Sequence, residues 1–155
     1  MPGRGLEVLL ALHAGAACAM AGVIWFIQVV HYPLFAKVGV DAFPTYHAAH
    51  ARLTTWVVGP LMLAEAAAAV ALWLLRPAGA NPAQLWASLL LVALLWATTF
   101  LVAVPRHGAL AGGFEPAVAA SLVTTNWVRT VVWTAHAAVA LLVARDVLTA
   151  AASAR

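Results

Sequence analysis

The sequence predicts an all-α integral membrane protein in which four helices cross a lipid bilayer as a bundle. Of the 155 residues, 65% are hydrophobic and 8% are charged, which lies far outside the range of soluble domains. Four apolar stretches, residues 6–30, 53–75, 85–104 and 122–148, are each near or above the roughly 20 residues that a spanning helix needs. We therefore expect one transmembrane domain over residues 1–155, with the lipid bilayer as its main partner.

The four stretches are taken in chain order. Arg4 and the apolar residues after it imitate a secretory signal, but stretch 6–30 is too long for one. Proline and glycine interrupt helices, and they separate the stretches from one another. These breaks are Tyr32-Pro33, the segment 76–79, Pro105 and Gly112-Gly113.

The second and fourth helices are expected to begin well before their apolar cores. Pro44 and Pro116 follow Asp41 and Glu115, and proline is well tolerated in the first turn of a helix. Each helix would then be about 50 Å long and would project from the membrane on the same side. A weak echo between 53–57 and 123–128 admits two interpretations: a duplicated helical hairpin, with two hairpins around an axis along the membrane normal, or chance similarity.

The charges indicate orientation rather than a charged partner. The net charge of +3 comes from single basic residues beside apolar stretches, so nucleic acid is not an expected partner, and the single Cys18 excludes a disulfide framework. Positive residues favour the cytoplasmic side, which places both termini in the cytoplasm. The basic residues on the side of the termini are Arg4, Arg76, Arg145 and Arg155, against Lys37, Arg52 and Arg106 on the other.

Most histidines lie in the two loops that an even number of helices places on one side. His47 and His50 are three residues apart on the expected second helix, so both rings can face one point, and His31 and His107 can close the site. Imidazole suits transition metals, so these four residues are candidate ligands of iron, copper or zinc. The other interpretation is that the four histidines are solvated or lie among lipid headgroups.

The fourth helix contains a charged residue inside the membrane. Arg129 lies about 10 Å below the apolar boundary at Leu122, where it either faces a polar pocket or reaches toward the headgroups. In the first case Arg129 would stabilise an anionic oxygen, Asn126 would orient a substrate and His107 would act as acid or base. These three residues are the candidate catalytic residues.

Three further ionisable residues share one deep layer. Counted along the helical rise, Glu65, His13 and His136 lie about 20–25 Å below the boundary on the side of the histidine-bearing loops. A neutral Glu65 hydrogen-bonded to either histidine would specify helix packing. The functional alternatives are a proton relay, or a cofactor site in which His13 and His136 are axial ligands of a haem or chlorin.

Three short motifs resemble those of uncharacterised bacterial four-helix membrane proteins, which in turn are similar to the anthrone-oxygenase-like family. They are Val-His-Tyr-Pro-Leu-Phe at 30–35, Pro-Arg-His-Gly-Ala-Leu at 105–110 and Asn-Trp-Val-Arg-Thr at 126–130. The resemblance implies a small membrane-bound oxygenase that acts on a hydrophobic polycyclic phenol, with His107, Asn126, Trp127 and Arg129 near the substrate. The pair at His47 and His50 is not part of that family's pattern.

Two functions from different classes follow. The first is a small membrane oxidoreductase or oxygenase that acts on an aromatic or quinone-like molecule in a histidine-rich pocket, with or without a metal. The alternative is a non-catalytic structural or accessory subunit of a larger membrane complex, or a homo-oligomer, in which small residues at 66–69 pack against neighbouring helices. Proton transport through the deep layer is a third interpretation, and it would require oligomers.

Overall fold

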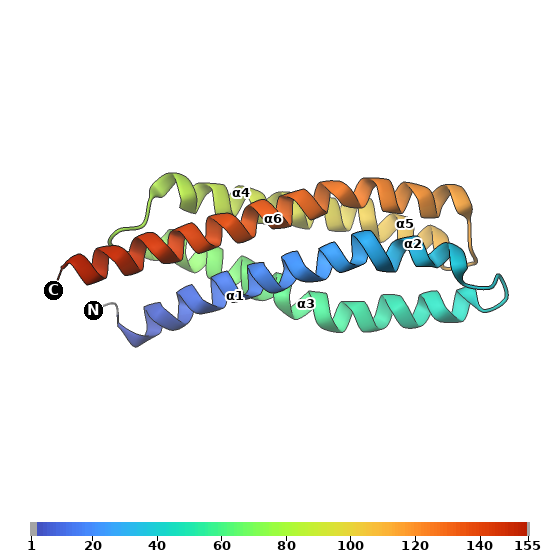
Figure 1. Ribbon diagram of the computed structural model, residues 1–155, viewed down its shortest axis with the longest axis horizontal. Helices are drawn as coiled ribbons and strands as arrows, with labels where there is room; N and C mark the ends of the chain where they lie inside the picture. Colours follow the sequence, from blue (N-terminus) through green and yellow to red (C-terminus); the bar gives the residue numbers. More distant parts are fainter. Residues whose placement is uncertain (1–2, 155) are drawn as a thin grey trace.

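The computed structural model describes residues 3–154 of the chain and confirms the expected all-α bundle (Figure 1). Four continuous helical rods, Arg4–Lys37, Phe43–Leu75, Pro82–Leu110 and Pro116–Ser153, are each long and apolar enough to cross a membrane. The first rod consists of α1 (Arg4–Phe26), η1 (Ile27–His31), α2 (Tyr32–Leu34) and η2 (Phe35–Lys37). The third consists of α4 (Pro82–Thr98), η3 (Thr99–Ala103) and α5 (Val104–Leu110), whereas α3 (Phe43–Leu75) and α6 (Pro116–Ser153) are single helices.

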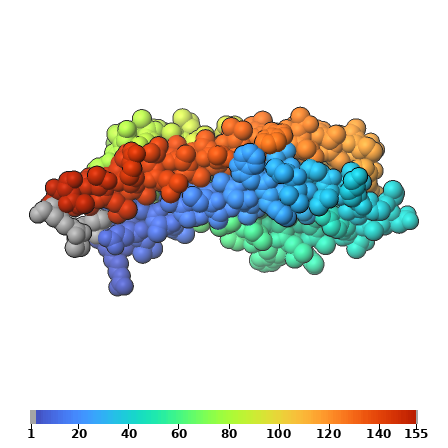
Figure 2. Space-filling model, in the orientation of Figure 1, coloured from blue at the N-terminus to red at the C-terminus, as the bar shows by residue number. Residues whose placement is uncertain are grey.

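The rods form an up-down-up-down bundle. In Figure 1 both termini lie at one end with the connection 76–81, and the connections 38–42 and 111–115 lie at the other end. The first rod packs against α3 and α6, and the third rod packs against the same two helices. Figure 2 shows the resulting elongated body, with α1 and α6 lying side by side along it. Short connections between antiparallel helices produce this arrangement.

The early starts of the second and fourth helices are confirmed. Pro44 lies in the first turn of α3 and Pro116 in the first turn of α6. The 38 residues of α6 span about 57 Å at the usual helical rise, almost twice the roughly 30 Å of a hydrocarbon core. These helices therefore extend past the apolar region on the side of the histidine-bearing loops.

The expected breaks at Pro33 and Pro105 are wrong, because the helical rods continue through both. A proline ring collides with the carbonyl group four residues earlier in a regular α-helix. In this chain a five-residue π-helical turn precedes each proline, and the amides of Tyr32 and Val104 donate to carbonyl oxygens five residues earlier. The wider turn changes the position of the carbonyl groups that the ring would meet, so the helix is not interrupted.

The first two rods and the last two rods form two helical hairpins, and each hairpin contains a π-helical turn followed by a proline at the same spacing. The π-helical turns begin at Ile27 and Thr99, 72 residues apart, and Pro33 and Pro105 have the same separation. The first-turn prolines of α3 and α6 are also 72 residues apart. This agreement favours the interpretation of the chain as a duplicated hairpin.

The bundle is apolar outside and carries its polar residues inside. Large apolar side chains such as Leu101, Trp56 and Leu90 are more than 65% exposed, as expected of a surface in contact with lipid. Ten polar or charged side chains are buried within the described part of the chain. They form three layers between the helices, and these layers define the candidate site.

Candidate active site and ligand cavity

The outermost polar layer is built from the two π-helical turns and the first turns of α3. The π-helical turn η1 ends at His31 and delivers Tyr32 into the bundle, where the tyrosine is 4% exposed. His47 and His50 project from α3 beside it, both buried. On the opposite side η3 leads into α5, which carries His107. Three of the four rods thus supply the layer.

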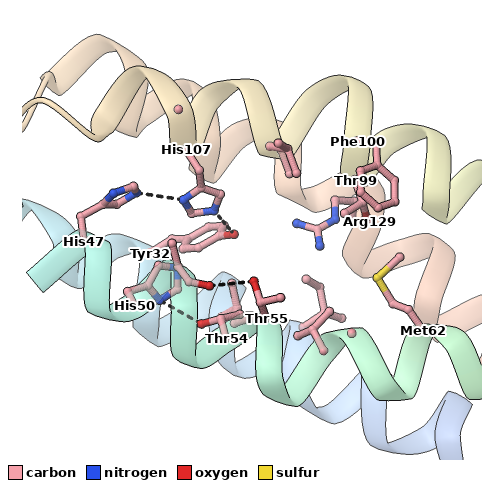
Figure 3. Close-up of a pocket in the computed structure, with 18 of the residues that line it drawn as sticks. Tyr32, His47, His50, Thr54, Thr55, Met62, Thr99, Phe100, His107 and Arg129 are labelled. Atoms are coloured by element: carbon pink, nitrogen blue, oxygen red, sulfur yellow. Dashed lines mark hydrogen bonds between the residues drawn. The ribbon is translucent and has the colours of Figure 1, made fainter.

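The four histidines come together as hydrogen-bonded pairs, and Figure 3 shows the pair of His47 and His107. His31 Nε2 lies 2.7 Å from His50 Nδ1, and His47 Nε2 lies 3.0 Å from His107 Nδ1. The other ring nitrogen of His107 is hydrogen-bonded to the Tyr32 hydroxyl group at 2.9 Å. Because both ring nitrogens of His107 have partners, its ring is fixed in orientation. Imidazoles held in this way can pass a proton along the chain Tyr32, His107 and His47.

The predicted metal site requires at least three ligands around one point. The chemistry of four imidazoles suits zinc, copper or iron. Among residues 3–154, however, no three histidine, cysteine, aspartate or glutamate side chains have an arrangement that could hold a metal ion. The ring nitrogens face one another in pairs, and His31 lies behind His50, outside the cavity lining. As arranged, these residues do not fit a metal centre, so the metal remains a prediction.

The middle layer surrounds Arg129, which is only 6% exposed. Its Nη1 donates to Asn126 Oδ1 at 2.9 Å, and its guanidinium group stacks over Trp133 at 5.1 Å from the ring centroid. No carboxylate of the described residues lies within 4.0 Å of it, since the ion pairs found there involve other residues. Its Nε has no hydrogen-bond partner. Arg129 therefore faces a pocket, the first of the two predicted alternatives, as a buried cation without a counter-ion.

Sequence reasoning missed the residue that organises this layer. Gln28, 2% exposed, accepts a hydrogen bond from Asn126 Nδ2 at 2.9 Å and donates to the Val123 carbonyl oxygen at 3.2 Å. Asn126 is therefore held between Gln28 and Arg129, and it does not line the cavity. Its contacts indicate that it positions the guanidinium group rather than a substrate. The signal in the sequence was a single glutamine within an apolar stretch.

A cavity of about 500 Å³ connects the outer and middle layers. Tyr32, His47, His50, His107 and Arg129 supply its polar wall, whereas the remaining lining is mainly aliphatic. In Figure 3 the guanidinium group of Arg129 and the hydroxyl group of Tyr32 point toward one another across it. Pockets of this size, apolar with a few convergent polar groups, are typical of sites for small hydrophobic molecules. The other lining residues are Met20, Ile24, Ile27, Ala48, Ala51, Thr54, Thr55, Val58, Gly59, Met62, Thr99, Phe100, Ala103, Val104, Gly108 and Ala111.

The deepest layer brings Glu65, His13 and His136 into one network, as their depths predicted. Glu65 Oε1 lies 3.3 Å from His136 Nδ1, and Trp133 Nε1 donates to Glu65 Oε2 at 3.0 Å. Ser88, which the sequence analysis did not single out, lies 3.0 Å from His136 Nε2 and 3.2 Å from His13 Nε2. All four rods contribute, so the network ties the bundle together.

The predicted haem or chlorin site would place a macrocycle between His13 and His136. Their ring centroids are 5.3 Å apart in an edge-to-face arrangement, and both Nε2 atoms face the Ser88 hydroxyl group. Neither histidine lines the cavity. These contacts do not fit axial ligation, so the pigment remains a prediction and the arrangement favours the alternative of hydrogen-bonded helix packing.

The buried guanidinium group leads to a first prediction, on stability. Replacing Arg129 by methionine is expected to raise the free energy of unfolding by about 1–3 kcal/mol, because removing an uncompensated buried charge outweighs the loss of one hydrogen bond. Thermal unfolding of purified protein in detergent measures this change. Arg129→Lys keeps the charge and should show no gain. A clear loss of stability in Arg129→Met would mean that the charge is already compensated.

Comparison of the chain with models of protein families, with curated proteins and with solved structures finds no significant match. The resemblance to the anthrone-oxygenase-like family therefore stays a prediction. The class of protein that the fold and the cavity define is a four-helix membrane protein with a mainly apolar cavity between its helices.

Proposed function

We propose that the protein is a small membrane oxidoreductase, of the oxygenase type, that acts on a hydrophobic aromatic or quinone-like molecule in the cavity. The observation that carries this proposal is the composition of the cavity wall. One part of an otherwise aliphatic space of about 500 Å³ is lined by three histidines, a tyrosine and an uncompensated arginine. Such groups remove protons and stabilise negative charge on oxygen.

The proposed reaction starts with deprotonation of the substrate. Both ring nitrogens of His107 are hydrogen-bonded, so the substrate proton reaches its Nε2 through the Tyr32 hydroxyl group, which passes its own proton to His107 and takes one from an acidic methylene or hydroxyl group of the substrate, while the hydrogen bond with His47 orients the His107 ring. Arg129 stabilises the charge that develops on the substrate oxygen. Dioxygen takes up the electrons: a methylene group becomes a carbonyl group that keeps one oxygen atom, and the second oxygen atom leaves as water. This reaction balances without a metal ion.

The surroundings of the site favour this function over that of an accessory subunit. The alternative rested on the small residues 66–69 as a surface for neighbouring proteins, but Ala68 and Ala69 are buried inside the bundle. Ala17, Ala137 and Ala140 likewise form a close contact between α1 and α6. Within the described chain, these alanines serve internal packing. From the charges beside the spans we place both termini in the cytoplasm, and from the resemblance to bacterial membrane proteins we place the protein in a bacterial inner membrane.

The proposal is tested by oxygen uptake with a hydroxyanthrone, a polycyclic phenol that also carries an acidic methylene group. Purified protein in phosphatidylcholine nanodiscs should consume oxygen well above the spontaneous rate and convert the probe to the corresponding anthraquinone. Glu115→Gln, at the exposed N-terminus of α6, should leave the rate unchanged. Binding of the probe without oxygen uptake would reject an oxygenase and leave a binding protein.

Metal analysis combined with an absorption spectrum tests the two cofactor predictions. We expect purified wild-type protein to contain no stoichiometric iron, copper or zinc, because the imidazoles pair with one another. One metal per chain that is lost in a His47→Ala, His50→Ala double variant would contradict this expectation and establish the outer metal site. A Soret or chlorin band that disappears with His13→Ala would establish the deep site.

A further inference from the structure

We propose that the cavity receives its ligand sideways from the lipid bilayer, between α3 and the η3–α5 segment, and that this ligand is an amphiphile with negative charge on a headgroup oxygen. The inference uses the cavity of the proposed function and deepens it. It names the route and the charge of the ligand, neither of which the oxidation chemistry determines.

The route follows from the exposed residues of the cavity lining. Ala48 and Thr55 on α3 are exposed, as are Phe100 on η3 and Val104 and Gly108 on α5. Thr55, Phe100 and Val104 lie within the apolar stretches 53–75 and 85–104, so this part of the opening lies at the depth of the lipid. The exposed fractions of Phe100 and Val104 are 54% and 50%, although both also line the cavity. A molecule dissolved in the membrane can therefore reach the cavity without crossing the loops.

Two small residues of this rim, Ala48 and Gly108, lie next to His47 and His107 in the chain. A Cβ atom added at Gly108 would meet no other heavy atom within 4 Å. Further into the bundle the walls carry Met20, Ile24 and Met62, side chains that suit a hydrocarbon or aromatic body of variable shape. The cavity is thus polar on one part of its wall, apolar on the rest and open at its side. An amphiphile has the same distribution of polarity.

The charge of the headgroup follows from polar atoms that the protein leaves unsatisfied. Among the described residues, two of the buried polar side-chain atoms without a hydrogen-bond partner belong to residues that line this cavity, Arg129 Nε and Thr99 Oγ1. Buried polar groups nearly always have partners, and each exception requires an explanation. Both groups can donate a hydrogen bond, and one carries a positive charge without a nearby carboxylate. An anionic oxygen supplies both the acceptor and the missing counter-charge.

Photoaffinity labelling tests the charge. The probe is a long-chain carboxylate with a diazirine in its chain, and the matched probe has the same chain and a quaternary ammonium headgroup. In phosphatidylcholine nanodiscs we expect the carboxylate to label peptides from α3 and from η3–α5, and the ammonium probe to label neither above the level of unrelated lipid-facing peptides. Arg129→Met should lower labelling at least about tenfold, the loss expected for a charge-assisted hydrogen bond in a buried site.

Three further variants serve as controls for this result. Arg106 is the matched arginine, because it donates to Ser121 Oγ at 2.9 Å and does not line the cavity, so Arg106→Met should label like the wild type. Arg129→Lys retains the charge and should keep most of the labelling, and Arg129→Gln replaces Arg129→Met if the methionine variant does not fold. Equal labelling by both probes, or labelling that is independent of Arg129, would overturn the anionic headgroup.

The route has its own test. Gly108→Leu places a side chain into open space at the rim and should reduce labelling several-fold. Gly22→Leu is the matched control on α1, since it is exposed, has equally open surroundings and does not line the cavity. Unchanged labelling in Gly108→Leu would overturn lateral access. Charge-dependent labelling without oxidation of hydroxyanthrone would reject the proposed oxygenase alone, and oxidation with charge-independent labelling would reject this inference alone.

Discussion

Replacing Glu65 by alanine is expected to lower the free energy of unfolding by about 2–6 kcal/mol, because two buried donors lose their acceptor at about 1–3 kcal/mol each. Glu65 is 2% exposed and accepts from Trp133 Nε1 at 3.0 Å. Its other carboxylate oxygen faces His136 Nδ1 at 3.3 Å. Trp133 and His136 are both 0% exposed, so no solvent-accessible surface offers these donors another partner. The measurement is thermal or denaturant-induced unfolding of protein purified in detergent.

Two companion variants separate the network from the loss of side-chain volume. Glu65→Gln keeps one acceptor oxygen at nearly the same volume, so it should lose clearly less stability than Glu65→Ala. Glu7→Ala removes an exposed carboxylate from α1 and should change stability by less than about 0.5 kcal/mol. If Glu65→Ala unfolded like the wild type, the deep layer would not hold the bundle together.

Much of the architecture could be predicted because a membrane protein shows its fold in composition and length. The four spans follow from apolar stretches, and the early start of α6 follows from the tolerance of helices for proline in their first turn. The grouping of Glu65 with His13 and His136 needed only the helical rise, and the structure places the three in one network. Depth along a helix is readable from sequence.

The direction in which a side chain faces is harder to predict, and this limited how many of the site residues could be predicted correctly. Asn126 and Arg129 share one helix, yet Arg129 lines the cavity and Asn126 lies behind it. Which of two neighbouring residues faces the cavity depends on the rotation of α6 against three other rods. Gln28 and Ser88 were missed for the same reason, since a single polar residue in an apolar stretch does not show what it will contact.

The π-helical turns were also beyond sequence reasoning. Proline is a reliable helix breaker in water, where freed carbonyl groups find other partners. Inside a membrane an interrupted helix would leave backbone groups unsatisfied, so a local widening is the less costly solution. This solution places Tyr32 inside the bundle and Thr99 on the cavity wall. The site therefore depends on the two π-helical turns, which the sequence did not predict.

The largest effect on activity is expected for His107→Leu, which should lower oxygen uptake with hydroxyanthrone by about 10²–10⁴-fold, the usual contribution of a general base. His107 lines the cavity and is hydrogen-bonded to both Tyr32 and His47, so it joins the substrate space to the other polar groups. Leucine has a similar volume and cannot accept a proton. The variant should lose about 1–3 kcal/mol of stability for each buried partner it leaves unpaired, Tyr32 and His47, but it should still fold and be labelled by the long-chain carboxylate, because Arg129 is unchanged.

His31→Leu is the informative comparison. His31 contacts His50 at 2.7 Å but does not line the cavity, so in the proposed reaction its loss should reduce oxygen uptake far less than the loss of His107. A metal centre held by all four histidines would make the two variants equally inactive and would remove the metal from both. Equal activity of wild type and His107→Leu would contradict the general base, and with it the proton transfer on which the proposed oxidation depends.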